Sequence, residues 1–215
     1  MLATPEFKLL GSSLFLIPVA LCLAAWMWVG NARRMAATWI LLFATALALV
    51  AASKMAYIGW GITIDAIGFH GISGHAMRST AVAPVLFYLL LHDARPGLRA
   101  AGVLFGLGAG ALMAIAVSVY DEHSASEALA GLLLGAATSL GFIRLARGMR
   151  KPEFDRARIA SLSVCSALAV SAGASVDNDP SYAMLESAAL FLSGNDKPYC
   201  AQQDAPATAQ SPAGS

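Results

Sequence analysis

Long apolar runs without a charged residue are the feature that most constrains how this chain folds. Each approaches the ~20 residues with which a helix crosses the ~30 Å of membrane hydrocarbon. Such runs cover Leu9 to Ala32, Met35 to Ser53, Ala100 to Tyr120 and Ile159 to Val176. A chain with 58% hydrophobic and only 13% charged residues fits an integral membrane protein.

Two further apolar runs are shorter, Ser79 to Leu91 and Ala128 to Ile143. They reach membrane length if their helices begin near His75 and near Ser124. The sequence therefore predicts an all-α, polytopic membrane protein, a six-transmembrane-helix bundle. Its spans are expected at about 12–30, 36–53, 76–92, 99–120, 125–146 and 159–176.

The positions of lysine and arginine predict the orientation. Ten of the 14 basic residues fall in alternate connections, after spans one, three and five, while Lys8, Lys54, Arg78 and Lys197 fall on the other side. Because cytoplasmic connections carry the excess of positive charge, both termini are expected to be extracytoplasmic. High alanine and arginine usage favours a bacterial inner membrane. The side that carries the termini, Lys54 and Arg78 would then face the periplasm.

Outside the spans, the sequence predicts little folded structure. Residues 54–73 are polar and glycine-rich and are expected to form an outer loop with an interfacial helix. Residues 177–200 form an external segment, in which Asp179-Pro180 and Gly194 bound a short amphipathic helix over Ser181 to Ser193. This helix either lies on the membrane or covers a site. Residues 201–215 are expected to be a disordered tail.

Glycines spaced four residues apart indicate close helix packing, at positions 102, 106 and 110 and at 131 and 135.

The predicted topology places several chemically active residues on one side of the membrane. Ser73 and Gly74 immediately precede the third span, where backbone N–H groups and the helix dipole favour a bound anion. Ionisable side chains at the ends of membrane spans are costly, so they indicate function. Those expected on the outer face are Lys54, His75, Arg78, His123 and Glu127.

These motifs resemble the type 2 phosphatidic acid phosphatase family of membrane lipid phosphatases, over roughly Met35 to Gly141. The matching residues are Lys54, Ser73-Gly74-His75 and His123-Ser-Ala-Ser-Glu127. The resemblance implies metal-independent hydrolysis, with no cofactor, of a phosphomonoester or diphosphate of a lipid; it implies no nucleic-acid partner. It also implies that His123 attacks phosphorus to form a phosphohistidine and His75 protonates the leaving oxygen. Glu127 stands where the family usually has aspartate, and Lys54, Ser73 and Gly74 would hold the phosphate.

The chain departs from the family pattern and is a divergent member. Two phosphate-binding arginines of the family are replaced, at Gly61 and at Val117, and Ile72 replaces a proline. Each lost contact is worth about 10² to 10³ in rate. Arg78 lies one helical turn after His75 and is expected to compensate for one of them.

Other interpretations stay open. Ser-Gly-His also fits a capped helix start, and Lys54 fits an interfacial anchor whose chain snorkels to the membrane surface. The missing arginines favour a non-hydrolytic relative that binds or transfers a phosphorylated lipid, or a structural membrane subunit. A small-solute transporter ranks third. Neither His70 nor His92 matches a motif, and we assign no role to either from the sequence.

Overall fold

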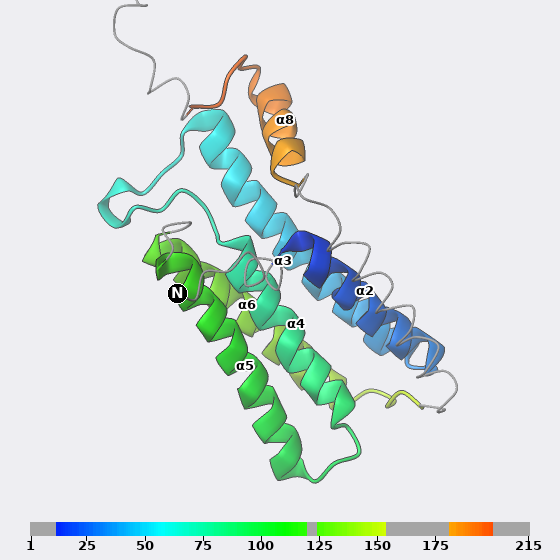
Figure 1. Ribbon diagram of the computed structural model, residues 1–215. Coiled ribbons are helices and arrows are strands. Elements are labelled where there is room, and N and C mark those ends of the chain that lie inside the picture. The colour runs from blue at the N-terminus through cyan, green and yellow to red at the C-terminus, as the bar shows by residue number, and fades with distance from the viewer. Residues whose placement is uncertain (1–11, 120–123, 154–180, 200–215) are drawn as a thin grey trace, which may run out of the picture.

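A computed structural model describes residues 12–119, 124–153 and 181–199. Within them the chain is helical, apart from turns, loops and one isolated bridge between Ile64 and Phe69, so the all-α prediction is confirmed there. The elements are α2 (Ser13–Val29), α3 (Arg33–Trp60), the 3-10 helix η1 (Asp65–Ile67), α4 (Gly74–Leu90), α5 (Pro96–Val119), α6 (Ala125–Ala146) and α8 (Ser181–Ser193). Figure 1 shows α2 to α6 running lengthwise along one bundle.

Three of these helices, α3, α5 and α6, are long and apolar enough to cross a membrane, and α2 is a shorter apolar helix. Large apolar side chains on their outer surfaces are more than half exposed, including Leu104, Phe105 and Leu112 on α5. A surface of this kind is suited to lipid rather than water. The chain is therefore a membrane protein. Residues 159–176, the expected sixth span, and the expected tail at 201–215 lie outside the described residues.

The central helix of the bundle is α4, which packs mainly against α5 and α6 and also touches α2 and α3. Most of its residues are buried, among them Arg78, Ser79 and Thr80. Polar and charged groups are costly in contact with lipid. The neighbouring helices therefore shield α4, which carries these polar groups, from lipid.

Glycines on the two flanking helices allow this close approach. A Cβ atom placed on Gly106 of α5 would lie 2.6 Å from the backbone nitrogen of Pro84, and one on Gly135 of α6 would lie 2.4 Å from the carbonyl oxygen of Met77. Gly110 and Gly131 face α4 in the same way. Association of helices in lipid relies on such packing because the hydrophobic effect between them is lost. The predicted packing role of these glycines is confirmed.

Aromatic packing joins α2, α3 and α6 on the other side of α4. The Trp39 indole N–H donates to the carbonyl oxygen of Ala20 on α2 over 2.9 Å. The same ring stacks on Phe43 with centroids 5.2 Å apart and meets Phe142 of α6 edge-on at 5.4 Å. Trp39 is 1% exposed, so it fixes three helices with one buried side chain whose polar atom is satisfied.

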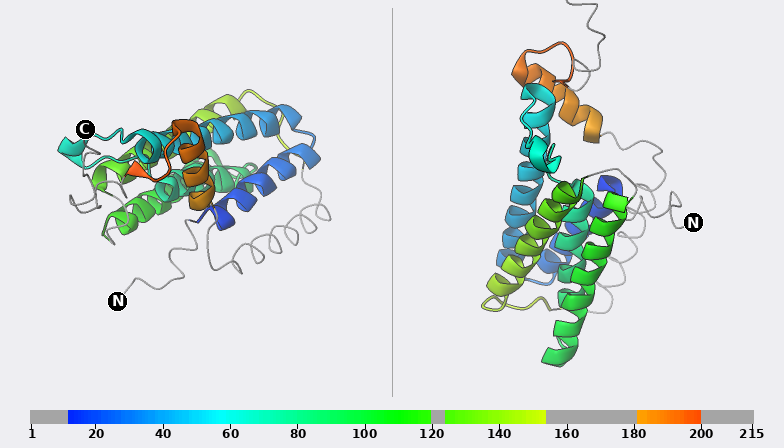
Figure 2. Two further views of the ribbon diagram at one scale, coloured as in Figure 1. Left: turned by 90° about the horizontal axis from the view of Figure 1, so that it is seen from above. Right: turned by 90° about the vertical axis from the view of Figure 1, so that its left-hand side faces the viewer.

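The end of α3 differs from the expectation. We expected a loop from residue 54, but α3 continues to Trp60, and the loop begins at Gly61. No helix-breaking residue precedes Gly59, and α8 packs against this end of α3, with Asn195 Nδ2 donating to the Gly59 carbonyl over 2.8 Å. The helix expected over Ser181 to Ser193 is present with these bounds. Figure 2 shows it beside the end of α3 that rises above the other helices.

Substitution of Gly106 by alanine is predicted to destabilise the bundle by about 1 to 3 kcal/mol, because its new Cβ meets backbone atoms of α4 that have no room to move. Gly108 on the same helix provides the matched control, since a Cβ atom added there would have no neighbouring atom within 4 Å. Gly108→Ala should be neutral or stabilising by up to about 1 kcal/mol through helix propensity. Unfolding of both variants in detergent, followed by circular dichroism, measures the difference. Equal stability of the two would contradict the packing role.

Candidate functional site

The Ser73-Gly74-His75 motif forms the N-terminus of α4. Ser73 is the N-cap, fully buried, and its hydroxyl oxygen accepts from the Ala76 N–H at a long 3.5 Å. The Ser73 N–H donates to the Glu127 carbonyl oxygen over 3.1 Å, which ties α4 to the first turn of α6. The N–H groups of a first helical turn have no acceptor within the helix and carry the positive end of its dipole. This end of α4 is thus suited to an anion.

The Arg78 side chain folds back over this helix terminus. A Cβ atom on Gly74 would lie 2.8 Å from Nη1 of Arg78, so the guanidinium packs directly against this glycine. Arg78 is 8% exposed. The structure therefore places a buried positive charge beside Gly74, as the spacing of one helical turn predicts.

Lys54 reaches the same place from α3. It is half-buried, and its Cγ lies 3.2 Å from a Cβ position at Gly71, just before the α4 N-terminus. Its ammonium group interacts electrostatically with both the Arg78 guanidinium and the Glu127 carboxylate. We call Lys54, Arg78 and Glu127 the charge cluster. It combines side chains from three helices, α3, α4 and α6.

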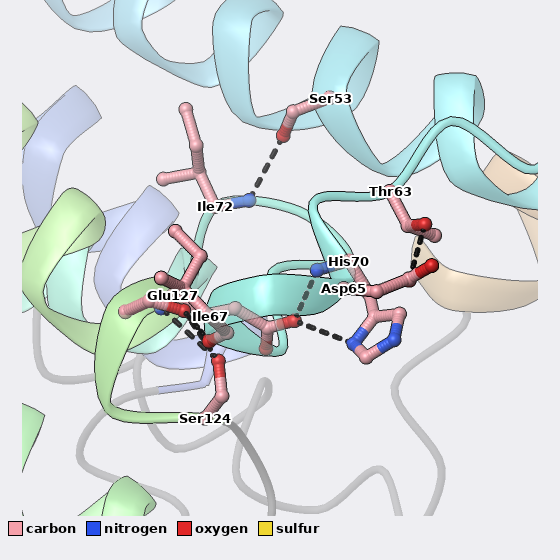
Figure 3. Close-up of polar contacts among 9 residues, drawn as sticks. Ser53, Thr63, Asp65, Ile67, His70, Ile72, Ser124 and Glu127 are labelled. Atoms are coloured by element: carbon pink, nitrogen blue, oxygen red, sulfur yellow. Dashed lines mark hydrogen bonds and ion pairs between the residues drawn. The ribbon is translucent and has the colours of Figure 1, made fainter.

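Glu127 contacts a residue to which the sequence assigned no role. Its Oε1 accepts from the His70 backbone N–H over 2.8 Å, and Nδ1 of the same histidine lies 3.4 Å from Oε1 (Figure 3). The Glu127 side chain is 8% exposed and that of His70 is 45% exposed. The Tyr57 ring meets the His70 ring edge-on, with centroids 4.9 Å apart. His70 therefore covers the carboxylate on its outer side.

Two further hydrogen bonds attach the loop of residues 61–73 to the helices around it. The Ile72 N–H donates to Ser53 Oγ on α3 over 3.0 Å (Figure 3). Ser126 Oγ of α6 donates to the Ile67 carbonyl oxygen over 3.0 Å. Within the loop, Thr63 Oγ1 donates to Asp65 Oδ1 over 2.6 Å. The loop, whose only helical part among the described residues is the short η1, thus holds His70 against α6.

Of the two predicted catalytic histidines, the described residues include His75 but not His123. His75 is the second residue of α4 and is half-buried at the helix terminus that faces the charge cluster. His123 lies outside the described residues, directly before Ser124, the N-cap of α6. Ser124 Oγ accepts from the Glu127 N–H over 3.3 Å. The structure thus gathers Lys54, Ser73, Gly74, His75, Arg78 and Glu127 near one end of the bundle.

The positions of the two replaced family arginines have structural roles of their own. Gly61 ends α3 in the left-handed conformation, with φ of 65°, and the Tyr199 ring lies 2.6 Å from its Cβ position. An arginine there would be strained and would collide with that ring. Val117 is 5% exposed and packs with Ala76 of α4 and Ala128 of α6. Neither residue supplies a phosphate-binding side chain.

His70 is the site residue that reasoning from the sequence missed. It contacts Glu127 across 57 positions of the chain, a separation that no helical or strand spacing encodes. One signal was present: an ionisable residue in the short loop that directly precedes Ser73-Gly74-His75. The charge cluster holds two positive groups and one negative group, so its net charge attracts anions.

Fold and site together define a helical membrane protein with a shielded, net-positive cluster at one end of its bundle. The chain belongs to the PAP2 superfamily, whose model matches residues 63–151. An uncharacterized 22.5 kDa protein in the cps region of Klebsiella pneumoniae is 39% identical over 144 residues, 66% of this chain and 69% of that protein. No solved structure matches the chain.

Removal of the Glu127 carboxylate is predicted to leave Arg78 and Lys54 without their counter-charge. Glu127→Ala should therefore lower the free energy of unfolding by about 3 kcal/mol, the lower end of the range for a broken buried pair, because Lys54 is only half-buried. Glu153→Ala is the control, since it breaks an exposed pair with Arg150 (N···O 2.6 Å) and should cost at most about 1 kcal/mol.

Denaturant unfolding in detergent measures both variants. The double variant Glu127→Ala/Lys54→Met should recover part of the loss, because it removes one of the unopposed charges. If Glu127→Ala is no more harmful than Glu153→Ala, the carboxylate does not balance the cluster.

Proposed function

We propose that the protein is an integral membrane phosphatase that hydrolyses a phosphomonoester or diphosphate of a lipid. The observation that carries this proposal is the convergence of Lys54, Arg78 and Glu127 at the Ser73-capped N-terminus of α4. Two cations beside a helix N-terminus bind the equatorial oxygens of a phosphoryl group and stabilise the charge that develops on them. Membership of the PAP2 superfamily supports a phosphatase-type reaction.

In the proposed reaction the phosphate lies against Gly74, held by Lys54, Arg78 and the first-turn N–H groups. A ring nitrogen of His123 attacks phosphorus, the bond from phosphorus to the leaving oxygen breaks, and His75 donates a proton to that oxygen. Water then attacks the phosphohistidine and releases inorganic phosphate, regenerating His123. Glu127, four residues after His123 in the sequence, orients the attacking histidine. The roles are proposed by resemblance for the histidines and from geometry for Lys54 and Arg78.

A groove between α2, α4 and α5 supports a lipid substrate. Its volume is ≈ 350 Å³, and Ser79 and Val82 of α4, which follow Arg78, contribute to its wall. Its other lining residues are apolar and come from α2, α4 and α5: Phe15, Leu16, Val19, Ala83, Leu86, Ala109, Leu112 and Met113. A hydrocarbon chain in this groove would leave its phosphate near Arg78.

The proposed topology has six spans, with both termini and the charge cluster on the periplasmic side of a bacterial inner membrane. Supporting this orientation, Arg33 and Arg34 lie at the start of α3 and Arg144 at the end of α6, at the ends of these helices remote from Lys54 and Glu127. The excess of basic residues marks the cytoplasmic side. The sixth span, 159–176, belongs to this proposal.

A second candidate is a relative that binds or transfers a phosphorylated lipid without hydrolysing it. The observation in its favour is the structure at Gly61 and Val117, where neither residue supplies a phosphate contact. The two candidates share the phosphate-binding cluster and differ in turnover.

Substrate turnover distinguishes the two candidate functions. The purified protein, with chelator present, is predicted to release phosphate from at least one lipid in a panel of isoprenoid diphosphates, phosphatidic acids and lipid A phosphates. His123→Ala should abolish the release of phosphate. No phosphohistidine should be trapped in this variant. Arg78→Ala should lower kcat/KM by about 10² to 10³, because it removes one charged contact to the transition state. The exposed Arg95 gives the control, Arg95→Ala, which should leave the rate unchanged.

Lipid binding without release from any substrate would favour the second candidate. Release that persists in His123→Ala would exclude the proposed nucleophile.

A further inference from the structure

A second basic site lies at the opposite end of the bundle from the charge cluster. A pocket of ≈ 360 Å³ opens between the α2–α3 connection and the segment that follows α6. It is lined by Asn31 to Met35 and by Gly148, Met149 and Arg150. Three of these residues are arginines, Arg33, Arg34 and Arg150. The proposed hydrolysis makes no use of this pocket.

The walls of the pocket are fixed by contacts between the two segments. The Glu153 N–H donates to the Gly30 carbonyl oxygen over 2.9 Å, and Pro152 Cβ lies 2.8 Å from a Cβ position at Gly30. The chain that leaves α6 is therefore pinned against the turn between α2 and α3. The arginines of both segments consequently face one space rather than separate regions of solvent.

The charge of the pocket is positive. Arg150 is paired with Glu153, with a nitrogen to oxygen distance of 2.6 Å, which offsets one of the three guanidinium groups. Arg33 and Arg34 add two positive charges at the start of α3. The N-cap of α3 is Ala32, which makes no side-chain capping hydrogen bond, so the positive end of a 28-residue helix also faces the pocket. Anion binding is favoured by all of these groups.

The pocket lies at the depth of a lipid headgroup. Arg34 and Lys54 are 20 residues apart on α3, and Glu127 and Arg147 are 20 residues apart on α6 and its C-cap. At about 1.5 Å per residue each separation is about 30 Å, the thickness of the membrane hydrocarbon. The Arg33 guanidinium lies over the half-exposed Trp28 ring, 5.5 Å from its centroid, an arrangement typical of the membrane interface.

We infer that this pocket binds the phosphate of an anionic phospholipid headgroup from the leaflet opposite the charge cluster. Arg33, Arg34 and the α3 N-terminus contact the phosphate, and the apolar tails remain in the membrane beside Trp28. Basic pockets between transmembrane helices bind such headgroups on the cytoplasmic side of membranes. A bound lipid here would hold the α2–α3 connection against the end of α6.

Native mass spectrometry of the full chain in neutral detergent tests the inference. Phosphatidylglycerol should be retained in preference to phosphatidylcholine with the same acyl chains, and glycerol 3-phosphate should not compete at equal concentration. The variant Arg33→Gln/Arg34→Gln should lower phosphatidylglycerol affinity about 30-fold, because each arginine near an anionic surface contributes about a fivefold factor. Arg150→Gln should give a smaller loss, since Glu153 already offsets its charge.

The matched control is Arg144→Gln/Arg147→Gln. It removes the same charge from the same end of the bundle, but these two residues do not line the pocket. An equal loss of affinity in both double variants would mean that surface charge alone attracts the lipid, and would overturn the inference. So would retention that is lost in Lys54→Gln but kept in Arg33→Gln/Arg34→Gln, because it would place the lipid at the charge cluster. Neither result depends on whether the protein hydrolyses phosphate.

Discussion

The Glu127 carboxylate offsets part of the positive charge of Lys54 and Arg78 at the end of a membrane bundle, and the geometry of the site depends on it. Its side chain is almost fully buried and interacts with Lys54, while Oε1 accepts the His70 N–H. Its own carbonyl accepts from Ser73, so the same residue anchors the N-terminus of α4. An unbalanced charge in this position would cost several kcal/mol. One acidic residue thus links the loop of residues 61–73, α3, α4 and α6 into one site.

Close packing around α4 is the second condition for this site. Gly131 lies against the Ser73 carbonyl oxygen, and Gly74 leaves room for the Arg78 guanidinium. The first contact brings α6, and with it Glu127, up to the α4 terminus. The second lets a long side chain return to the helix start. The replaced arginines fit the same account, because Gly61 and Val117 meet packing and conformational demands where family members have phosphate ligands.

Much of this architecture could be predicted from the sequence because its signals are local. Charge-free runs locate α3, α5 and α6, and the proline and glycine around 181–193 locate α8. Glycine spacing predicts which helix faces pack. Lys54 and Arg78 were also expected on one side, since the positive-inside rule assigns whole connections at once.

The remainder depends on contacts that no local pattern encodes. The pairing of His70 with Glu127 joins residues far apart in the chain, and His70 lies in a loop between α3 and α4. α3 extends to Trp60, and α8 packs against this end, with Asn195 Nδ2 donating to the Gly59 carbonyl oxygen. Both places carry tertiary contacts, and the periodicity of the sequence does not predict such contacts.

The central claim is that the charge cluster binds a phosphoryl group, and orthovanadate tests it most directly because it mimics that group without requiring knowledge of the lipid. The account predicts that orthovanadate raises the thermal stability of the wild-type protein in detergent. This stabilisation should disappear in Lys54→Gln and in Arg78→Gln but persist in Arg33→Gln/Arg34→Gln. Absence of any stabilisation of the wild type, or its full retention in Lys54→Gln and Arg78→Gln, would contradict the claim.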